Sequence, residues 1–233
     1  MFSYRVRLPA EIHSNQTSEQ TVVEGEDIVL NCPATGYPHP RVEWRRKDRK
    51  VLPDTSSVKL YGETLQIDSV RREDRGEYSC TADNQVSAPV SKHFTLKVRF
   101  GPRISVPRPR VHQALSHGVS LVCDIEAYPA PAITWTKNGV SIVNEENYFV
   151  VHFSRGDTLT ASTVKIDYLN PDHFGIYECH ASNIHGEATQ RLELIQTKIP
   201  IPVAHYGSGV SAVNGSLYLY LFIQIAVSLT FAL

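Results

Sequence analysis

The sequence predicts an all-β protein made of two consecutive antiparallel β-sandwiches, followed by an apolar C-terminal segment. Three observations predict this fold: an internal repeat, a pair of cysteines in each copy of the repeat, and apolar residues that alternate with polar ones. The length of 233 residues is enough for two domains of ordinary size. No stretch in either copy keeps the 3.6-residue period of an amphipathic helix, so helices should be minor.

The repeat aligns the two halves of the chain around their cysteines. Cys32 falls on Cys123, 91 positions later, and the same offset places Tyr37-Pro38 on Tyr128-Pro129. Farther along, the offset grows to 99, and the motif Gly-x-Tyr-x-Cys-x-Ala-x-Asn at 76–84 recurs at 175–183. The second copy therefore has eight extra residues, which we expect around 144–157 as a longer connection between middle strands.

Alternating apolar residues predict half-buried strands at matching places in both copies. The alternating runs are bounded by Gly, Pro, Asn and Asp, which favour turns. The matched sets are Ile28, Leu30 and Cys32 with Val119, Leu121 and Cys123; Val42 and Trp44 with Ile133 and Trp135; Leu65 and Ile67 with Val164 and Ile166; and Phe94, Leu96 and Val98 with Leu192 and Leu194.

The cysteines and aromatic residues of each copy form the core pattern of an immunoglobulin-like sandwich of the I-set or C2 type. A disulfide bridges the two sheets, which pack roughly 10 Å apart, and a tryptophan packs against it. Tyr78 and Tyr177 lie two residues before the second cysteine, where the hydroxyl bonds to nearby backbone. We therefore expect two disulfides and two buried tryptophans: Cys32–Cys80, Cys123–Cys179, Trp44 and Trp135.

The two copies differ at the position six residues before the second cysteine. The first copy has Asp74 there, whereas the second has His173, with Asp172 one position earlier. A capping or ion-pairing role for an acidic side chain is therefore predicted more firmly for the first copy.

The composition argues against several functional classes. A net charge of -1 lacks the basic excess of a nucleic-acid-binding protein. We interpret the densest basic stretch, Arg45–Lys50, as ordinary surface. The four cysteines include no C-x-x-C pair, so no zinc ribbon or thioredoxin-like motif is expected, and their even number favours disulfides in an exported protein.

Two similar strings suggest where the domains begin. Residues 98–104 join the two copies, and residues 6–12 resemble them at a similar distance before the first cysteine. We expect residues 1–9 to be a linker from a preceding domain, absent from this chain together with its signal peptide. The expected divisions are immunoglobulin-like domains at 10–99 and 100–197, a polar stalk with the anchor site at 198–216, and a hydrophobic tail at 217–233.

The tail predicts a glycosylphosphatidylinositol (GPI) anchor signal. Residues 217–233 carry no charge and are followed by no Lys or Arg, which disfavours a single transmembrane helix, the alternative. The small residues Gly207-Ser208-Gly209 followed by a short spacer fit an anchor signal, with Ser208 as the attachment residue. Asn214-Gly215-Ser216 is a second candidate that leaves almost no spacer. Attachment at Ser208 would leave no cytoplasmic part.

A glycosylation sequon lies near the start of the first copy, at Asn15-Gln16-Thr17. In an exported protein this sequon predicts a glycan on Asn15. A second sequon, at Asn214, would be removed with the tail.

The sequence offers no arrangement of residues for catalysis. The ten histidines lack metal-ligand spacing on a shared face, and the chain has no phosphate-binding loop or dinucleotide fingerprint. Gly207-Ser208-Gly209 lacks the strand–turn–helix context of a nucleophile elbow. We therefore expect a binding protein rather than an enzyme, with no cofactor, metal or small-molecule substrate.

Longer strings resemble the lachesin family of insect immunoglobulin-superfamily proteins. Residues 104–110, 113–115 and 125–137 are similar to the third domain of that family, and residues 73–87 to its second domain. The resemblance covers nearly the whole chain. It implies three immunoglobulin domains, a lipid anchor and cell–cell adhesion at neuronal or epithelial surfaces. In that family the first domain is the main adhesive surface, and this chain matches only the two that follow.

We therefore expect a GPI-anchored cell-surface adhesion or recognition protein on the extracellular side of the membrane. Its expected partners are other immunoglobulin-superfamily proteins, a second copy of itself among them. The alternative is a receptor ectodomain for a soluble ligand that signals through a co-receptor.

Overall fold

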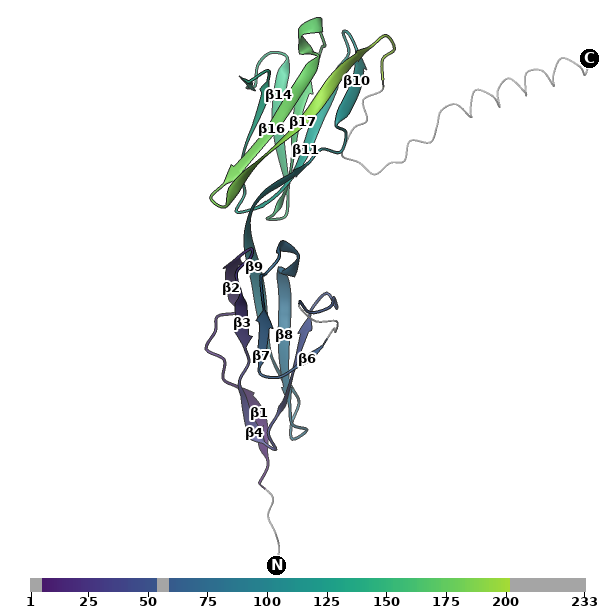
Figure 1. The fold of residues 1–233 in the computed structure, drawn as a ribbon. Helices are drawn as coiled ribbons and strands as arrows, with labels where there is room; N and C mark the ends of the chain where they lie inside the picture. Colours follow the sequence, from purple (N-terminus) through teal and green to yellow (C-terminus); the bar gives the residue numbers. More distant parts are fainter. Residues whose placement is uncertain (1–5, 54–58, 202–233) are drawn as a thin grey trace, which may run out of the picture. The chain divides into compact units, whose positions relative to one another are not determined.

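Both copies of the repeat fold as β-sandwiches in the computed structural model of the protein, which describes residues 6–53 and 59–201 (Figure 1). Strands dominate these residues, and their helical content is limited to two 3₁₀ helices of one turn, η1 (Arg72–Asp74) and η2 (Pro171–His173). The prediction of an all-β tandem with minor helices is confirmed.

The first sandwich combines short paired strands with one larger sheet. β3 pairs with β7 and β1 pairs with β4, both antiparallel, while β6, β5, β8 and β9 follow one another in the larger sheet and β2 runs parallel to β9. The strands are β1 (Leu8–Ile12), β2 (Glu19–Val23), β3 (Ile28–Asn31), β4 (Ala34–Tyr37), β5 (Arg41–Arg46), β6 (Leu60–Tyr61), β7 (Thr64–Ile67), β8 (Gly76–Asp83) and β9 (Val90–Ser105).

The second sandwich has two clearly separate sheets. One has the order β10-β17-β16-β12-β13, and the other joins β14, β15 and β11 to the end of β9. The strands are β10 (Arg110–Ala114), β11 (Val119–Tyr128), β12 (Ala132–Lys137), β13 (Val140–Ile142), β14 (Tyr148–Arg155), β15 (Leu159–Ile166), β16 (Gly175–Asn183) and β17 (Gly186–Thr197).

The strand β9 belongs to both sandwiches. Its first half pairs with β8, and its second half pairs with β11 from Phe100 to Ser105. The register with β11 shifts between Glu126 and Tyr128, opposite Gly101-Pro102. Because proline has no N–H to donate, a shift here lets the strand continue through Pro102. The stretch predicted as a linker is therefore a continuous piece of β-structure.

Each sandwich has its own core around a disulfide. Cys32 is bonded to Cys80 and Cys123 to Cys179, with Cα atoms 6.5 and 6.7 Å apart. The four cysteines are fully buried, as are the tryptophans and tyrosines expected beside them: Trp44, Tyr78, Trp135 and Tyr177. The Trp44 ring packs 5.5 Å from that of Phe94, and its indole N–H donates to the carbonyl of Gly62, while Trp135 donates to Ser162.

The eight extra residues of the second copy form a strand, not the longer connection that we expected. β14 pairs with β15 along its whole length, from Tyr148 opposite Ile166 to Arg155 opposite Leu159. The sequence did not reveal this strand because all eight of its residues are exposed or half-buried, so it has no row of fully buried apolar residues. Among the described residues, no comparable strand pairs with β7 in the first sandwich beyond β3.

Candidate functional site

The tyrosine corners fix the turn that precedes the last core strand in each sandwich. The hydroxyl of Tyr78 donates to the carbonyl of Asp74 at 2.6 Å, and that of Tyr177 donates to the carbonyl of His173 at 2.6 Å. Burial raises the pKa of both phenols far above the ordinary range. Both therefore remain neutral hydrogen-bond donors at physiological pH.

His173 performs in the second sandwich the backbone cap that Asp74 performs in the first. The backbone N–H of Arg71 donates to a carboxylate oxygen of Asp74 at 2.8 Å, and the N–H of Asn170 donates to Nδ1 of His173 at 2.9 Å. Burial, with a further contribution from Lys137, lowers the pKa of His173 below its ordinary value. The neutral imidazole of His173 thus takes the place that the Asp74 carboxylate has in the first copy of the repeat.

The interpretation of the basic stretch Arg45–Lys50 as ordinary surface is wrong for Arg46. The side chain of Arg46 is buried, with its guanidinium carbon 5.3 Å from the centre of the Tyr78 ring. It donates hydrogen bonds to the backbone carbonyls of Glu73 and Arg75 at 3.2 and 3.1 Å. The other members of the stretch that form ion pairs do so with acidic neighbours: Arg45 with Glu43, Lys47 with Glu77 and Lys50 with Asp48.

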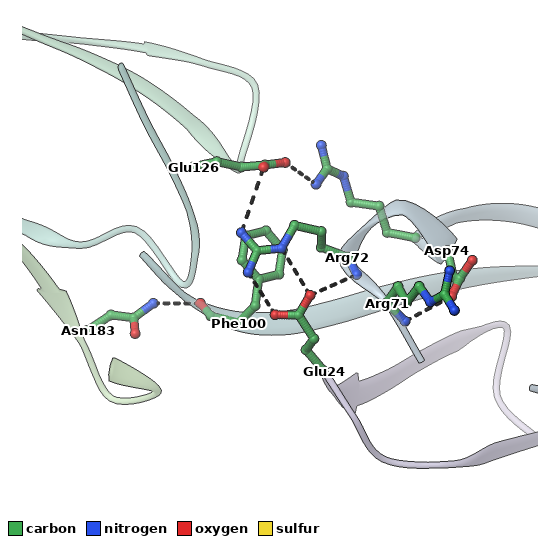
Figure 2. Close-up of polar contacts among 8 residues, drawn as sticks. Glu24, Arg71, Arg72, Asp74, Phe100, Glu126 and Asn183 are labelled. Carbon is green, nitrogen blue, oxygen red and sulfur yellow. Dashed lines mark hydrogen bonds and ion pairs between the residues drawn. The ribbon is translucent and has the colours of Figure 1, made fainter. Parts of the chain in front are cut away.

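Four charged side chains and one aromatic ring lie where β9 passes from one sandwich to the other (Figure 2). We call these residues, Glu24, Arg72, Arg75, Glu126 and Phe100, the joint cluster. Arg72, on η1, donates two side-chain hydrogen bonds to Glu24, at 2.9 and 2.8 Å. This bond lowers the pKa of the Glu24 carboxyl and raises that of the Arg72 guanidinium. A planar guanidinium suits such paired contacts with a carboxylate.

Glu126 connects this cluster to the second sandwich. Its carboxylate, which projects from β11, lies 2.9 Å from Nη1 of Arg75 and 3.8 Å from Nη1 of Arg72. The guanidinium of Arg72 also lies 4.5 Å from the centre of the Phe100 ring, and Phe100 itself is buried in the first core. The joint cluster therefore joins a turn of one sandwich, a strand of the other and the strand that they share.

Asn183 closes the other side of the joint. Its side-chain amide donates to the carbonyl of Phe100 at 3.0 Å and to that of Pro129 at 2.9 Å. The adjoining turn approaches closely: a Cβ added to Gly101 would lie 2.9 Å from the carbonyl oxygen of His185. The side chain of Tyr128 packs against the first core from the second sandwich.

The start of the first sandwich repeats this arrangement with no sandwich before it in the described chain. Asn84 corresponds to Asn183 in the repeat, and its amide donates to the carbonyls of Leu8 at 2.7 Å and Pro38 at 3.0 Å. Leu8 and Tyr37 correspond to Phe100 and Tyr128. Leu8 is 54% exposed and Tyr37 is 61% exposed, whereas Phe100 is 1% exposed. Leu8 and Tyr37 are therefore exposed at the start of the first sandwich, at positions equivalent to residues that pack inside the joint.

The sequence did not reveal the joint cluster, although it contained one signal. The two asparagines were visible in the repeated motif, but the motif gave them no role. Arg72 and Glu126 fall on the uncharged residues Pro171 and Thr35 in the other copy, so the repeat could not single them out.

The sequon lies in the connection between β1 and β2. Asn15 is exposed, while Gln16 beside it is tied to β3 by bonds to Val29 and Asn31. The residues of the predicted anchor, including Ser208 and the tail 217–233, lie outside the described residues.

The described residues bring together no group of acidic, histidine or cysteine side chains able to hold a metal ion. Across residues 6–53 and 59–201, the structure contains no helix long and apolar enough to cross a membrane. Histidines are instead used in local hydrogen bonds, such as that of His152 with Ser162 at 3.0 Å.

Comparisons with known proteins agree with this fold. The model of the immunoglobulin domain matches residues 9–84 and 101–183. A crystal structure of Dpr2 Ig1-Ig2 in complex with DIP-Theta Ig1-Ig3 contains a chain that superposes with a TM-score of 0.75 and 31% identity, covering 82% of this chain and 66% of that one. Titin domains A164-A165 show the same fold at 20% identity and a TM-score of 0.58, covering 83% and 99% of the two chains.

Similar sequences come from insects. Lachesin of Drosophila melanogaster is 43% identical over 84% of this chain and 54% of its own length. Lachesin of Schistocerca americana is 39% identical over 93% and 63%, and protein amalgam of Drosophila melanogaster is 37% identical over 86% and 60%. The chain thus spans between about half and two thirds of these relatives. The chain belongs to the immunoglobulin-domain family and is a lachesin-like member of it.

Proposed function

We propose that this chain acts at the cell surface in adhesion or recognition, through contacts with other immunoglobulin-superfamily proteins, and that it binds rather than catalyses. The observation that carries this proposal is the tandem of disulfide-bonded sandwiches with 43% identity to lachesin. The structural relative crystallised as an immunoglobulin–immunoglobulin complex supports partners of the same fold. The resemblance to lachesins supports contacts between neuronal or epithelial cells.

A mixed-cell assay tests adhesion. Two populations of otherwise non-adherent cells, one displaying the chain and one displaying a candidate immunoglobulin-superfamily protein or the chain itself, should form joint aggregates. Cells displaying the chain with both domain cysteine pairs replaced by alanine provide the control, because the sandwiches should not persist without them. Absence of aggregates or of protein recruited to cell contacts, with every partner tried, would count against adhesion.

We further propose that a glycolipid anchor attached at Ser208 holds the protein on the extracellular side of the membrane. The uncharged segment 217–233 and the small residues before it support this proposal. Phosphatidylinositol-specific phospholipase C should release the protein from intact cells, and Ser208→Pro should reduce surface display. Protein that resists the enzyme and labels from the cytoplasmic side would support a spanning helix instead.

Asn15 is proposed as a glycosylation site because its side chain is exposed beside a hydroxyl-bearing Thr17. Treatment with peptide-N-glycosidase should increase the electrophoretic mobility of the wild-type protein. Asn15→Gln should show the mobility of the treated protein with or without the enzyme. A wild-type mobility that the enzyme leaves unchanged would contradict the proposal.

Residues 1–9 are proposed to be a linker that follows a preceding immunoglobulin domain. The match between the Asn84–Leu8 and Asn183–Phe100 hydrogen bonds supports this proposal, together with the exposure of Leu8 and Tyr37. In a longer form of the protein, amides around Leu8 and Tyr37 should be protected from hydrogen exchange relative to this chain. Equal exchange in both forms would argue against a joint at this end.

A further inference from the structure

The strand β14 is an unpaired edge of the second sandwich. It pairs with β15 on one side and has no strand on its other side within the described chain. Its eight residues include neither lysine nor proline, the residues with which proteins often block such edges. In the sheet order β14-β15-β11-β9, β14 occupies the place of strand D, the edge strand of one sheet of an immunoglobulin sandwich.

One face of β14 presents an exposed apolar row. Phe149, Val151 and Phe153 alternate along the strand and are 40%, 56% and 63% exposed. The intervening residues face the sandwich: Val150 packs against the core, and His152 bonds to Ser162. The row thus contributes little to the core of its own sandwich, and three large apolar side chains on a free strand edge are typical of a surface that pairs with another chain.

The backbone edge of β14 is occupied over only part of its length. The N–H and carbonyl of Tyr148 bond to Glu145 at 3.2 and 3.0 Å, and the N–H of Val150 bonds to the side chain of Asn144 at 2.6 Å. Since bonding directions alternate along a strand, the remaining outward groups belong to Val150, His152 and Ser154. The carbonyl of Val150 and both backbone groups of His152 and Ser154 are therefore available to a new strand.

We propose that β14 binds β14 of a second copy of the chain, antiparallel and about a two-fold axis at His152. In this register the two His152 residues exchange two backbone hydrogen bonds. The N–H of each Ser154 donates to the Val150 carbonyl of the other copy. Four bonds form, and the Ser154 carbonyl receives none, because it faces the Val150 N–H that Asn144 already occupies.

The apolar rows complement one another in the same register. Residues directly opposite in an antiparallel pair project to the same face. Val151 of each copy therefore faces Phe153 of the other, and Phe149, whose ring lies 5.8 Å from Nζ of Lys165 in its own copy, faces Arg155. No like charges oppose each other within the paired strands.

Other registers fit less well. If the register shifts by two residues toward the start of β14, the second copy faces the outward backbone groups of Tyr148 and Val150. Glu145 and Asn144 already occupy these groups, apart from the carbonyl of Val150. A shift by two residues toward the end of β14 would place Arg155 against Val151 and leave Phe149 unpaired. Permanent dimers bury roughly 2,000 Å² or more, and a single pair of edge strands is a small contact by comparison, so we expect the pairing to be reversible.

Cysteine cross-linking on the full chain displayed on cells tests the pairing. His152→Cys should give a covalent dimer under mild oxidation, because residues that exchange both bonds have Cα atoms about 5.5 Å apart, within reach of a disulfide. Ser154→Cys is the matched control on the same edge, since the two copies of residue 154 would lie about 14 Å apart. Absence of the His152→Cys dimer, or equal dimer from both variants, would overturn the proposal.

Charge substitution tests the facing residues in the His152→Cys background. Val151→Glu with Phe153→Glu should reduce the dimer at least tenfold, because like charges would face each other across the two-fold axis. Val151→Glu with Phe153→Lys should restore it, because each glutamate would face a lysine. These side chains are exposed, so surface levels should stay unchanged. Loss of the dimer in both variants, or in neither, would contradict the pairing of Val151 with Phe153.

This inference deepens the proposed adhesion role by naming one partner, yet its test is separate. Cells that aggregate normally with no β14 cross-link would overturn only the inference. A clear cross-link on cells that never adhere would overturn only the adhesion role.

Discussion

Single positions of the two sandwiches achieve the same backbone geometry with different chemistry. Asp74 and His173 both accept the N–H of the residue three positions earlier, and a tyrosine hydroxyl donates to the carbonyl of each. The sequence showed the substitution but not that an imidazole nitrogen would accept the same bond. Only the backbone conformation of the turn brings Nδ1 within reach of Asn170.

The imidazole should make the second sandwich sensitive to acid. The pKa of His173 is lower in the folded protein than in the unfolded chain, because the fold favours the neutral ring. The unfolded chain therefore binds the proton first, near pH 6.5, and the stabilisation from neutral His173 is lost as the pH falls from there through the lower folded pKa. Lys137 opposes protonation, whereas Asp172 favours it weakly.

Thermal unfolding between pH 8 and pH 5 measures this effect. The unfolding temperature of the second sandwich should decrease as the pH is lowered in the wild type. It should change less in His173→Asp, which places the residue of the first copy at this position. The loss of a cap bond is worth about 1 kcal/mol. Parallel pH profiles for the two proteins would show that His173 is not the responsible group.

The stabilisation from the Tyr78 corner should not depend on pH, because burial raises the pKa of the Tyr78 phenol and keeps it neutral. Tyr78→Phe removes the donor to the buried carbonyl of Asp74 and should lower the free energy of unfolding of the first sandwich by about 1–3 kcal/mol. Chemical denaturation at pH 6 and at pH 9 should give the same difference, since the phenol is neutral at both. Tyr61→Phe, at an exposed position, is the control and should change stability little.

At the scale of strands, the sequence predicted those whose side chains alternate between core and solvent. Leu65 and Ile67 in β7 and Val164 and Ile166 in β15 are all fully buried, as their spacing predicted. β9 was missed as one strand because Gly101-Pro102 normally ends a strand, and only its pairing with β11 carries it onward. β14 was missed because its apolar residues are exposed at the edge of a sheet and not buried in a core, so they do not give the pattern of a core-facing strand.

The joint cluster depends on the geometry of one arginine. Arg72→Lys keeps the charge but loses the paired bonds to Glu24 and the flat contact with Phe100. We expect the free energy of unfolding of the first sandwich to decrease by about 1 kcal/mol, and amide exchange in residues 98–104 to be faster. Hydrogen-exchange mass spectrometry measures both.

Arg71→Lys is the matched control, because Arg71 is exposed and contributes its backbone N–H to the cap. It should leave exchange in β9 unchanged. Similar protection in the two variants would mean that Arg72 does not stiffen the joint.

At the scale of the molecule, the repeat predicted two cores with one disulfide each, and the structure has two separate clusters of buried residues. What the repeat could not predict lies between and beside these cores. The joint cluster pairs Glu126 of one copy with Arg72 and Arg75 of the other, so no comparison of equivalent positions reveals it. The same holds for the edge of β14, because in the described part of the first sandwich no strand pairs with β7 beyond β3.

Separate cores should respond separately to the loss of a disulfide. The bond between Cys32 and Cys80 closes a loop of 48 residues, and its removal costs about 4 kcal/mol in the chain-entropy estimate, a large share of the stability of a small domain. Cys32→Ala with Cys80→Ala should therefore unfold or loosen the first sandwich. The second sandwich keeps its own disulfide and should persist.

The two tryptophans report on the two sandwiches individually. Trp44 donates to Gly62 in the first core and Trp135 to Ser162 in the second, and the chain contains no other tryptophan. In the double alanine variant, the indole N–H of Trp44 should exchange quickly in nuclear magnetic resonance spectra while that of Trp135 stays protected. Replacement of Cys123 and Cys179 should reverse the pattern. If either variant exposes both indoles, β9 couples the sandwiches so strongly that they unfold as one unit.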